Sequence, residues 1–544
     1  MPLLYNLLPA VNLLKKKSIN GQRYVLTVDL GTSGPKVGLV SENGEVIDYL
    51  FAEIPLLLLP GGGAEQEPHL WKKAILSLAK KILSRHRDLK ASVKAVSCTA
   101  QWSGTVPVDR QGEPLMNCQL WMDSRGAPHI KNLMKGLITF EGLGLTKLLR
   151  WLWITGGAPT QSGKDTIAHI LYIKNELPDI YQKTCKFLEP LDYLNMIFTG
   201  NIKTAYETAT LTWLTNNRDI NNISYSPALM KMAGLDMQKF PELAAPDAIH
   251  GTLLPGLAKE LGISPDTPVT MGAPDTHSAA VGSGAVKDFQ AHVYIGTSSW
   301  MLCHVPFKKT DVAHNMASVP SAIPGRYILM NEQETAGACL KYLRDNILYH
   351  KDELLKESRV PDVYKIFDRL AASVPAGSDG VIFTPWLYGE RTPVDDHRVR
   401  ACLFNQSLST TRAHIVRAIF EGVAFNSRWL MFYLEKFIGR SLETINIIGG
   451  GAISDIWCQI YADVLNRKIR RVSDPVSANL RGAAMIAASA LKWKSFEEIA
   501  DDVKIDREFT PNEKNTALYD RMFKEFITIY KKNKDIFRRL NSGH

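Results

Sequence analysis

The sequence predicts an α/β fold made of two related domains. Residues 25–40 and 292–303 share one pattern: an apolar run rich in β-branched or aromatic residues, a Gly-Thr-Ser turn, and a second apolar run, which is typical of strand, tight turn and strand. Predicted strands also alternate with predicted helices, as in layered α/β domains. With 544 residues, the chain is too long for one core and favours two domains.

The two Gly-Thr-Ser turns, residues 31–33 and 296–298, predict a site for a phosphate chain. Glycine lets the backbone N–H groups of a turn face a bound anion, and the Thr and Ser hydroxyls add hydrogen-bond donors. One such turn is weak support. Two of them, one at the start of each half, indicate a duplicated pair of domains that holds a polyphosphate between them.

In the first half, the hairpin is followed by a third predicted strand over 45–49 and a helix over 70–83, which has acidic residues before its start. Residues 93–98 predict a short strand that opens into the segment Thr-Ala-Gln-Trp-Ser-Gly. The section from about 130 to 255 is largely helical in pattern, and we interpret it as insertions on the α/β core.

In the second half, residues 328–329 predict a strand, and an amphipathic helix is expected to run through 343. Apolar residues at helical spacing predict a long helix over 410–434. Residues 445–448 predict a buried strand that runs into three glycines. Beyond 491 the composition becomes charged and helical, which indicates a peripheral tail.

The composition argues against several classes of protein. Apolar residues make up 45% and charged residues 22%, which is ordinary for a soluble globular chain, and a net charge of +9 is modest, so we expect no nucleic-acid partner. The seven cysteines never form a C-x-x-C pair, which argues against disulfides or a structural zinc site and favours a reducing, cytoplasmic setting. No uncharged apolar run reaches the ~18 residues of a membrane span, and we expect no membrane association.

Asp29 and Lys36, on either side of the first turn, are candidates for phosphoryl chemistry. A carboxylate at a strand end can hold Mg²⁺ or its water shell against phosphates. The alternative is that Asp29 caps its own turn. Lys36 either meets the charge of a bound nucleotide or is a solvated hairpin lysine.

Asp275 is the candidate proton acceptor. A short predicted strand over 269–271 delivers it on a turn bent by glycine and proline, and a helix of small residues follows. A carboxylate in this place can accept a proton from a substrate hydroxyl as that oxygen attacks a γ-phosphate. The alternative is that Asp275 is a helix N-cap.

Residues 449–452, Gly-Gly-Gly-Ala, follow a predicted strand and precede a helical run. Glycines at such a junction allow a nucleotide to lie close to the backbone at a helix N-terminus, although an ordinary tight turn is the alternative. Gly163-Lys164 is similar to the end of a P-loop. It lacks the leading glycine and a preceding strand, so we set it aside.

Taken together, these motifs resemble the FGGY carbohydrate kinase family and are most similar to those of its xylulokinases. The resemblance covers about residues 24–491. The matching segments, in order and at the family's spacing, are 29–36, 121–125, 272–275, 296–298, 389–393, 412–424 and 449–452.

The resemblance implies two ribonuclease-H-like domains, as in actin and sugar kinases, with a nucleotide cleft between them. The first, over 24–286, is expected to bind the sugar and the second, over 287–491, to bind ATP. Residues 1–23 are then an N-terminal extension and 492–544 a helical charged tail. ATP and Mg²⁺ are the implied cofactors.

The resemblance also implies roles for individual residues. Asp275 matches the catalytic base, and Asp29 matches the metal-associated carboxylate. The other matches are phosphate contacts (Thr32, Ser33, Gly296 and Thr297), the adenosine segment (Gly450, Gly451 and Ala452) and sugar contacts (Gln101, Trp102 and Asp123).

The departures from the family's pattern concern the substrate. Xylulokinases usually have Gln-Met-His-Gly at residues 101–104, where this chain has Gln-Trp-Ser-Gly, and Asn at the position of Thr276. Glycerol kinases have Arg-Glu at Trp102 and Ser103, so glycerol is disfavoured. Trp102 either stacks on a sugar face or fills volume.

The expected function is ATP-dependent phosphorylation of a sugar or polyol hydroxyl, with D-xylulose as the first candidate substrate and D-xylulose 5-phosphate and ADP as products. The alternatives are a kinase for another ketose or polyol, such as ribulose, a pentitol or a tetrose, and a non-catalytic ATP-binding regulatory protein. The expected partners are the sugar or polyol and ATP, and a homodimer remains open.

Overall fold

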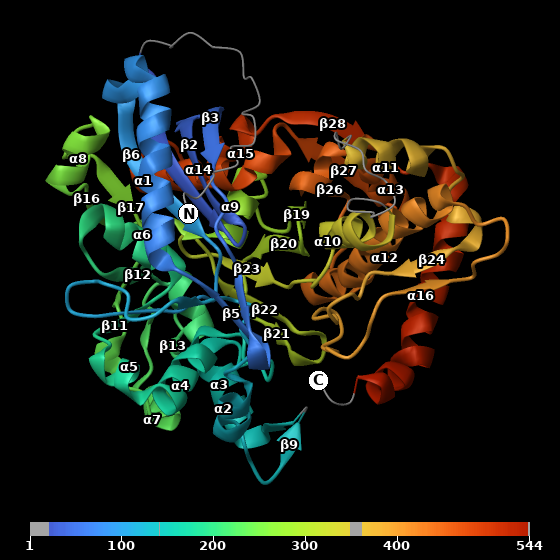
Figure 1. The fold of residues 1–544 in the computed structure, drawn as a ribbon, viewed down its shortest axis with the longest axis horizontal. Coiled ribbons are helices and arrows are strands. Elements are labelled where there is room, and N and C mark those ends of the chain that lie inside the picture. The colour runs from blue at the N-terminus through green and yellow to red at the C-terminus, as the bar shows by residue number, and fades with distance from the viewer. Residues whose placement is uncertain (1–20, 141, 349–361, 542–544) are drawn as a thin grey trace.

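The computed structural model describes residues 21–140, 142–348 and 362–541, so most of the expected N-terminal extension over 1–23 lies outside the described residues. Two α/β domains, each built on a mixed β-sheet, lie side by side (Figure 1). The predicted fold class is therefore confirmed.

The sheet of the first domain has the strand order β16-β17-β6-β1-β2-β3, with β18 paired to β6. β3, β2 and β1 are antiparallel, β6 and β17 continue parallel to β1, and β16 is an antiparallel edge strand. Their bounds are β1 Tyr24–Gly31, β2 Gly34–Ser41, β3 Val46–Phe51, β6 Val93–Ala100, β16 Ile249–Thr252, β17 Pro268–Thr270 and β18 Ala273–Pro274.

The sheet of the second domain has the order β21-β22-β23-β20-β19-β26-β27-β28. β23, β20 and β19 are antiparallel, β26 and β27 run parallel to β19, and β28 is an antiparallel edge strand. Six strands thus repeat the directions of the first sheet, which confirms the duplication. The bounds are β19 Ala291–Ile295, β20 Ser299–Val305, β21 Thr310–Asp311, β22 Met316–Pro320, β23 Tyr327–Met330, β26 Thr444–Ile448, β27 Lys468–Val472 and β28 Ile505–Phe509.

Helices cover both faces of the first sheet. Because successive residues of a strand face opposite sides, Leu26 packs in the same core as Trp71 of α1 (Pro68–Arg85), while Val25 packs with Leu480 of α14 (Ala478–Ala490). α14 therefore covers the first sheet although it lies in the segment expected to belong to the second domain. Beside it lies α9 (Asp275–Gly282).

The section between β6 and β16, two strands of the first sheet, forms a core of its own, with Trp151, Ile170 and Leu229 among its buried residues. Besides the expected helices, the section contains several short pairs of strands. Its helices are α2 Ala127–Leu133, α3 Leu145–Thr155, α4 Thr166–Glu176, α5 Pro178–Lys183 and α7 Pro227–Ala233, whereas α6 Pro190–Thr199 and α8 Pro255–Leu261 pack in the core of the first sheet. The short strands of the first half are β4 Leu57–Leu59, β5 Gly63–Gln66, β7 Val106–Val108, β8 Cys118–Gln119, β9 Thr139–Phe140, β10 Leu143–Gly144, β11 Lys186–Leu188, β12 Lys203–Ala205, β13 Thr215–Asn216, β14 Ser224–Tyr225 and β15 Glu242–Ala244.

The segment after 491 is more than a peripheral tail. β28 adds a strand to the edge of the second sheet, and α16 buries Tyr519, Met522 and Phe526 in the core of the second domain. The expectation of a peripheral tail is wrong because the apolar face of a charged helix is hidden in its average composition.

The helices of this half are α10 Gly337–Tyr342, α11 Val363–Ala372, α12 Arg412–Ile438, α13 Asp455–Leu465, α15 Phe496–Asp502 and α16 Glu513–Leu540, and its remaining strands are β24 Ile382–Thr384 and β25 Cys402–Phe404. Within the described ranges, none of the helices combines the length and the apolar character needed to span a membrane.

Candidate active site

Asp29 and Lys36 form an ion pair across the first hairpin. They are cross-strand partners on β1 and β2, and Lys36 Nζ lies 3.2 Å from Asp29 Oδ2. Burial acts to lower the pKa of Lys36, but the charge of Asp29 and their hydrogen bond outweigh it and raise that pKa, so Lys36 remains a cation. Asn479 of α14 donates to Asp29 Oδ1 at 3.4 Å. Neither contact is a cap of the Asp29 turn.

Asp275 is the first residue of α9 and follows β18, which pairs with the end of β6. Gly272 makes this close approach possible, because its φ is +68° and a Cβ there would lie 2.0 Å from the carbonyl oxygen of Cys98. The N–H of Thr276 donates to Asp275 Oδ1 at 2.8 Å, whereas the residue at the helix N-cap is Pro274. The N-cap interpretation of Asp275 is therefore wrong.

The pKa of Asp275 is raised to about 8. Burial is the main cause, the negative charges of Asp29 and Glu332 add to it, and the N–H of Thr276 acts in the opposite direction. The side chain of Asp275 is nevertheless partly exposed, whereas Asp29 is buried. An accessible carboxyl group with a pKa close to neutrality is suited to accept a proton.

The second turn, residues 296–298, is held by the start of α10. The N–H of Gly337 donates to the carbonyl oxygen of Gly296 at 2.8 Å, and the N–H of Ala336 donates to that of Thr297 at 2.9 Å. Thr297 itself is exposed. The carbonyl groups of Gly296 and Thr297 thus accept hydrogen bonds from the protein itself, while Thr297 stays accessible to solvent.

The triple-glycine segment lies beside the second turn. A Cβ on Gly449 would be 2.5 Å from the carbonyl oxygen of Ile295, the residue before that turn. Gly450 is exposed and has open space where a side chain would stand, Gly451 is half-buried, and the side chain of Ala452 is buried. Ala452 is buried as a whole residue, so Gly450 and Gly451 are the accessible part of this segment.

Asp123, a predicted sugar contact, is fully buried at 0% exposure. Its Oδ2 accepts hydrogen bonds from the N–H of Ala64 at 3.0 Å and from Arg125 Nη2 at 2.6 Å. Arg125 also contacts Glu65 at 2.5 Å. Burial opposes the charge of Arg125, but its hydrogen bonds to the two carboxylates raise its pKa. Asp123 is therefore bound to the protein itself and holds Arg125 in place.

Thr32 and Gln101 belong to one hydrogen-bond network. The Thr32 hydroxyl accepts from Trp121 Nε1 at 3.0 Å and donates to Gln101 Oε1 at 3.1 Å, while Gln66 Nε2 donates to the Thr32 carbonyl at 2.7 Å. The hydroxyl of Thr32, a predicted phosphate contact, is thus hydrogen-bonded to Gln101, a predicted sugar contact. Gln66 and Trp121 were not predicted as site residues, and the match at 121–125 is the signal that points to Trp121.

Trp102 is 7% exposed and packs in an apolar cluster with residues of both domains, among them Ala279 of α9 and Trp300 of β20. Its Nε1 donates to the carbonyl oxygen of Thr208 at 2.9 Å, and its ring meets His277 edge to face with centroids 5.1 Å apart. These contacts support the interpretation in which Trp102 fills volume.

An ion network joins the two domains. Lys164, from the loop before α4, lies 3.3 Å from Glu334, which precedes α10 in the second domain. Arg391 pairs with Glu334 at 3.0 Å and also with Glu332. Burial lowers the pKa of Lys164, and the charge of Glu334 opposes that shift. The Gly163-Lys164 segment is therefore part of a contact between domains, consistent with setting it aside as a P-loop.

Asp29 is the carboxylate at this site predicted to be associated with the metal, and its oxygens are the ligand type that a magnesium ion prefers. No group of three or more His, Cys, Asp and Glu side chains suited to a metal is found within the described residues. Mg²⁺ does not require such a group, since it is often held by one or two carboxylates together with substrate phosphates. The donor set is therefore compatible with the ion.

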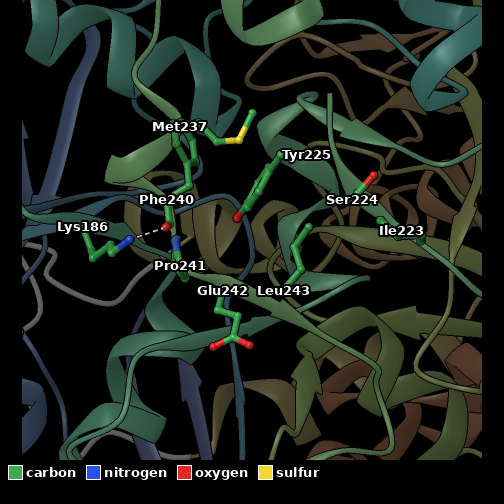
Figure 2. A pocket seen from close by; sticks show the side chains of 9 residues that line it. All are labelled: Lys186, Ile223, Ser224, Tyr225, Met237, Phe240, Pro241, Glu242 and Leu243. Atoms are coloured by element: carbon green, nitrogen blue, oxygen red, sulfur yellow. Dashed lines mark hydrogen bonds between the residues drawn. The ribbon is translucent and has the colours of Figure 1, made fainter. Parts of the chain in front are cut away.

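A pocket of 410 Å³ lies away from this site, in the inserted section of the first domain (Figure 2). Tyr225 and Phe240, with ring centroids 5.5 Å apart, form part of its wall, and Lys186 Nζ donates to the carbonyl oxygen of Phe240 at 2.7 Å. None of the predicted site residues lines this pocket.

Comparison with known proteins gives a consistent assignment. Residues 24–282 match the model of the N-terminal domain of the FGGY family of carbohydrate kinases, and residues 291–491 match its C-terminal domain. The chain is 29% identical over 517 residues to a xylulose kinase of Staphylococcus epidermidis, with 94% of this chain and 97% of that protein covered. It is 26% identical over 510 residues to a gluconokinase of Bacillus licheniformis, with 93% and 95% covered.

Solved structures share the fold. The crystal structure of a ligand-bound xylulose kinase from Lactobacillus acidophilus superposes with a TM-score of 0.81 at 23% identity and covers 95% of this chain and 100% of its own. The models of the N-terminal and C-terminal domains match in the expected order, and the observed fold agrees with them. The chain belongs to the FGGY family of carbohydrate kinases.

Proposed function

We propose that the protein is an ATP-dependent kinase of a neutral sugar or polyol, with D-xylulose as the first candidate substrate and Asp275 as the general base. The observation that carries this proposal is the position of Asp275 at the start of α9, where burial and then the charge of Asp29 raise its pKa. The xylulose kinases among its relatives support the choice of sugar.

The charges around the site favour a neutral substrate over an aldonate. Its cations are already paired with carboxylates: Lys36 with Asp29, Arg125 with Asp123 and Glu65, Lys164 with Glu334, and Arg391 with Glu332 and Glu334. A substrate carboxylate would therefore have to displace a carboxylate of the protein. Gluconate, the substrate that the name of one relative indicates, is disfavoured for this reason.

In the proposed reaction, Asp275 takes the proton of the substrate hydroxyl while that oxygen attacks the γ-phosphate of ATP. Lys36 stays charged beside Asp29 and offsets the negative charge that gathers between the two turns. When bound, Mg²⁺ would supply further neutralisation of the phosphate oxygens, and Asp29 is the side chain that would hold it. Closure of the two domains excludes water, which would otherwise hydrolyse ATP.

The test is the release of ADP in the presence of D-xylulose, D-ribulose, a pentitol, a tetrose and gluconate. We expect the highest kcat/KM with D-xylulose and the lowest with gluconate. Higher turnover with gluconate would contradict the neutral-substrate assignment. ATP binding without ADP release for any of these compounds would favour the non-catalytic alternative.

Replacing Asp275 by Asn removes the proton acceptor but keeps the shape of the side chain. General bases contribute about 10²- to 10⁴-fold, so we expect D275N to lose at least about 100-fold in kcat while its affinity for ATP is retained. Asp288→Asn is the matched control, because Asp288 pairs with Arg326 and has no role proposed here. Turnover of D275N within about tenfold of the unmodified protein would refute the role of Asp275.

A further inference from the structure

Tyr294 lies next to the second turn and has no role in the reaction described above. It belongs to β19 and faces Trp300 of β20, with the two rings stacked at a centroid distance of 4.0 Å and an angle of 10°. Trp300 is itself held, because its Nε1 donates to His292 Nε2 at 3.2 Å. The stack therefore holds the phenol ring of Tyr294 in one orientation.

The hydroxyl of Tyr294 lies over Gly296. A Cβ on Gly296 would be 2.3 Å from the hydroxyl oxygen and 2.3 Å from Cε1 of the ring. The phenol thus fills the space that a side chain at Gly296 would take. Its hydroxyl is in this way part of the surface of the turn at residues 296–298.

Charged groups of the first domain act on the same hydroxyl. The charges of Lys36, Asp29 and Asp275 all act on the pKa of Tyr294. Burial, opposed by Lys36 and assisted by the two carboxylates, raises that pKa to about 12. At neutral pH the phenol therefore keeps its proton and can act as a hydrogen-bond donor.

Three side-chain donors near the two turns already have partners. The Thr32 hydroxyl donates to Gln101, Lys36 is paired with Asp29, and the Ser298 side chain is hydrogen-bonded to Glu332. No hydrogen bond joins the Tyr294 hydroxyl to another residue of the described chain. An anion between the two turns would therefore meet a preoriented donor that has no competing partner.

We propose that Tyr294 is a further catalytic residue, whose hydroxyl donates a hydrogen bond to the phosphoryl group during its transfer. The proposal rests on the kinase function proposed above. In that step the sugar oxygen bonds to phosphorus, the bond from phosphorus to the leaving oxygen of ADP breaks, and the sugar proton passes to Asp275. Tyr294 keeps its own proton and stabilises charge on the transferring oxygens.

The test is Tyr294→Phe, which removes the hydroxyl and retains the ring that stacks on Trp300. A hydrogen bond to a charged group corresponds to about 10- to 100-fold, so we expect Y294F to lose that factor in kcat while the KM for the sugar stays within about twofold. Binding of ADP alone should be unchanged. Binding of ADP with Mg²⁺ and aluminium fluoride, which imitates the transferring group, should weaken by the same factor.

Tyr433→Phe is the matched control, because Tyr433 also stacks on another ring, that of His314, at 3.8 Å, in the second domain. Unchanged kcat and unchanged fluoride-complex binding in Y294F would overturn the proposal. An equal loss for ADP and for the fluoride complex would also overturn it, because it would show a general disturbance of the turn. Since the fluoride complex forms without a sugar, this experiment stays informative even when none of the tested sugars is a substrate.

Discussion

Asp275 shows how a single side chain takes its chemistry from its surroundings. Its pKa of about 8, caused first by burial and then by the charges of Asp29 and Glu332, means that the ligand-free protein carries a protonated Asp275 over much of the neutral range. The base must be ionised to act, so we expect kcat/KM to rise about tenfold per pH unit up to about pH 8.

Glu332→Gln removes one of the charges that raise the pKa of Asp275, so the acidic limb of that profile should move to lower pH. The measurement is kcat/KM between pH 5.5 and 9 for both proteins. Glu435→Gln, which removes a carboxylate paired with Arg467 away from the site, is the control and should leave the limb in place. If the acidic limb of the kcat/KM profile does not move in E332Q, a group other than Asp275 controls that limb.

Glu207 is a buried carboxyl group with an effect on stability. It is fully buried, neither of its side-chain oxygens has a hydrogen-bond partner, and burial raises its pKa to about 8. A folded-state pKa above the unfolded value means that stability is fully present below the unfolded pKa and is lost as pH rises through about 8. We expect Glu207→Gln to reduce the fall in melting temperature between pH 6 and 9. An equal fall in both proteins would contradict this assignment.

At the scale of elements, the contact between α9 and α14 fixes the position of α9, the helix that begins with Asp275. A Cβ on Gly482 of α14 would lie 1.8 Å from the carbonyl oxygen of Ser278, and one on Gly282 would lie 1.9 Å from that of Ala478. The two helices therefore touch through their backbones. Any side chain here has to push α9 and α14 apart.

Gly482→Ala tests this crossing. Alanine favours a helix over glycine by up to about 1 kcal/mol, but the overlap should prevail and destabilise the protein by about 1–3 kcal/mol. Gly256→Ala in α8 is the matched control, because no atom lies within 4 Å of its added Cβ and the change should be neutral or stabilising. Chemical denaturation measures both. A G482A protein as stable as the unmodified one would mean that the helices separate without cost.

The long helices and strands could largely be predicted from the sequence, but the segments and side chains with which they pair could not. Apolar spacing predicts the helix over 410–434, observed as α12 (Arg412–Ile438), and the strand over 445–448, observed as β26 (Thr444–Ile448). The strand β28 was not predicted because three consecutive charged residues separate Ile505 from Phe509, and the strand gains its stability from pairing with β27. Likewise, the sequence suggests Thr32 as a phosphate contact, whereas the observed partners of its hydroxyl, Trp121 and Gln101, depend on the folded chain.

At the scale of the whole molecule, the ion pair of Lys164 and Glu334 connects the two domains. Lys164→Met keeps the length of the side chain and removes its charge, so we expect the ligand-free protein to open and its radius of gyration in solution scattering to increase. Lys80→Met is the control, because Lys80 pairs with Glu260 inside the first domain. An identical radius of gyration for the Lys164 variant and the control would show that other contacts keep the domains together.

The position of α14 also has a consequence for the order in which the protein is made. Asn479 and its partner Asp29 are 450 residues apart in the chain. At about 5–20 residues per second, the ribosome supplies α14 roughly 20–90 s after β1. During that time the face of the first sheet that carries Val25, Val40 and Ala95 has no cover from Leu480. The first domain to be translated is therefore completed almost last, and a nascent chain of this protein exposes an apolar surface that chaperones can recognise.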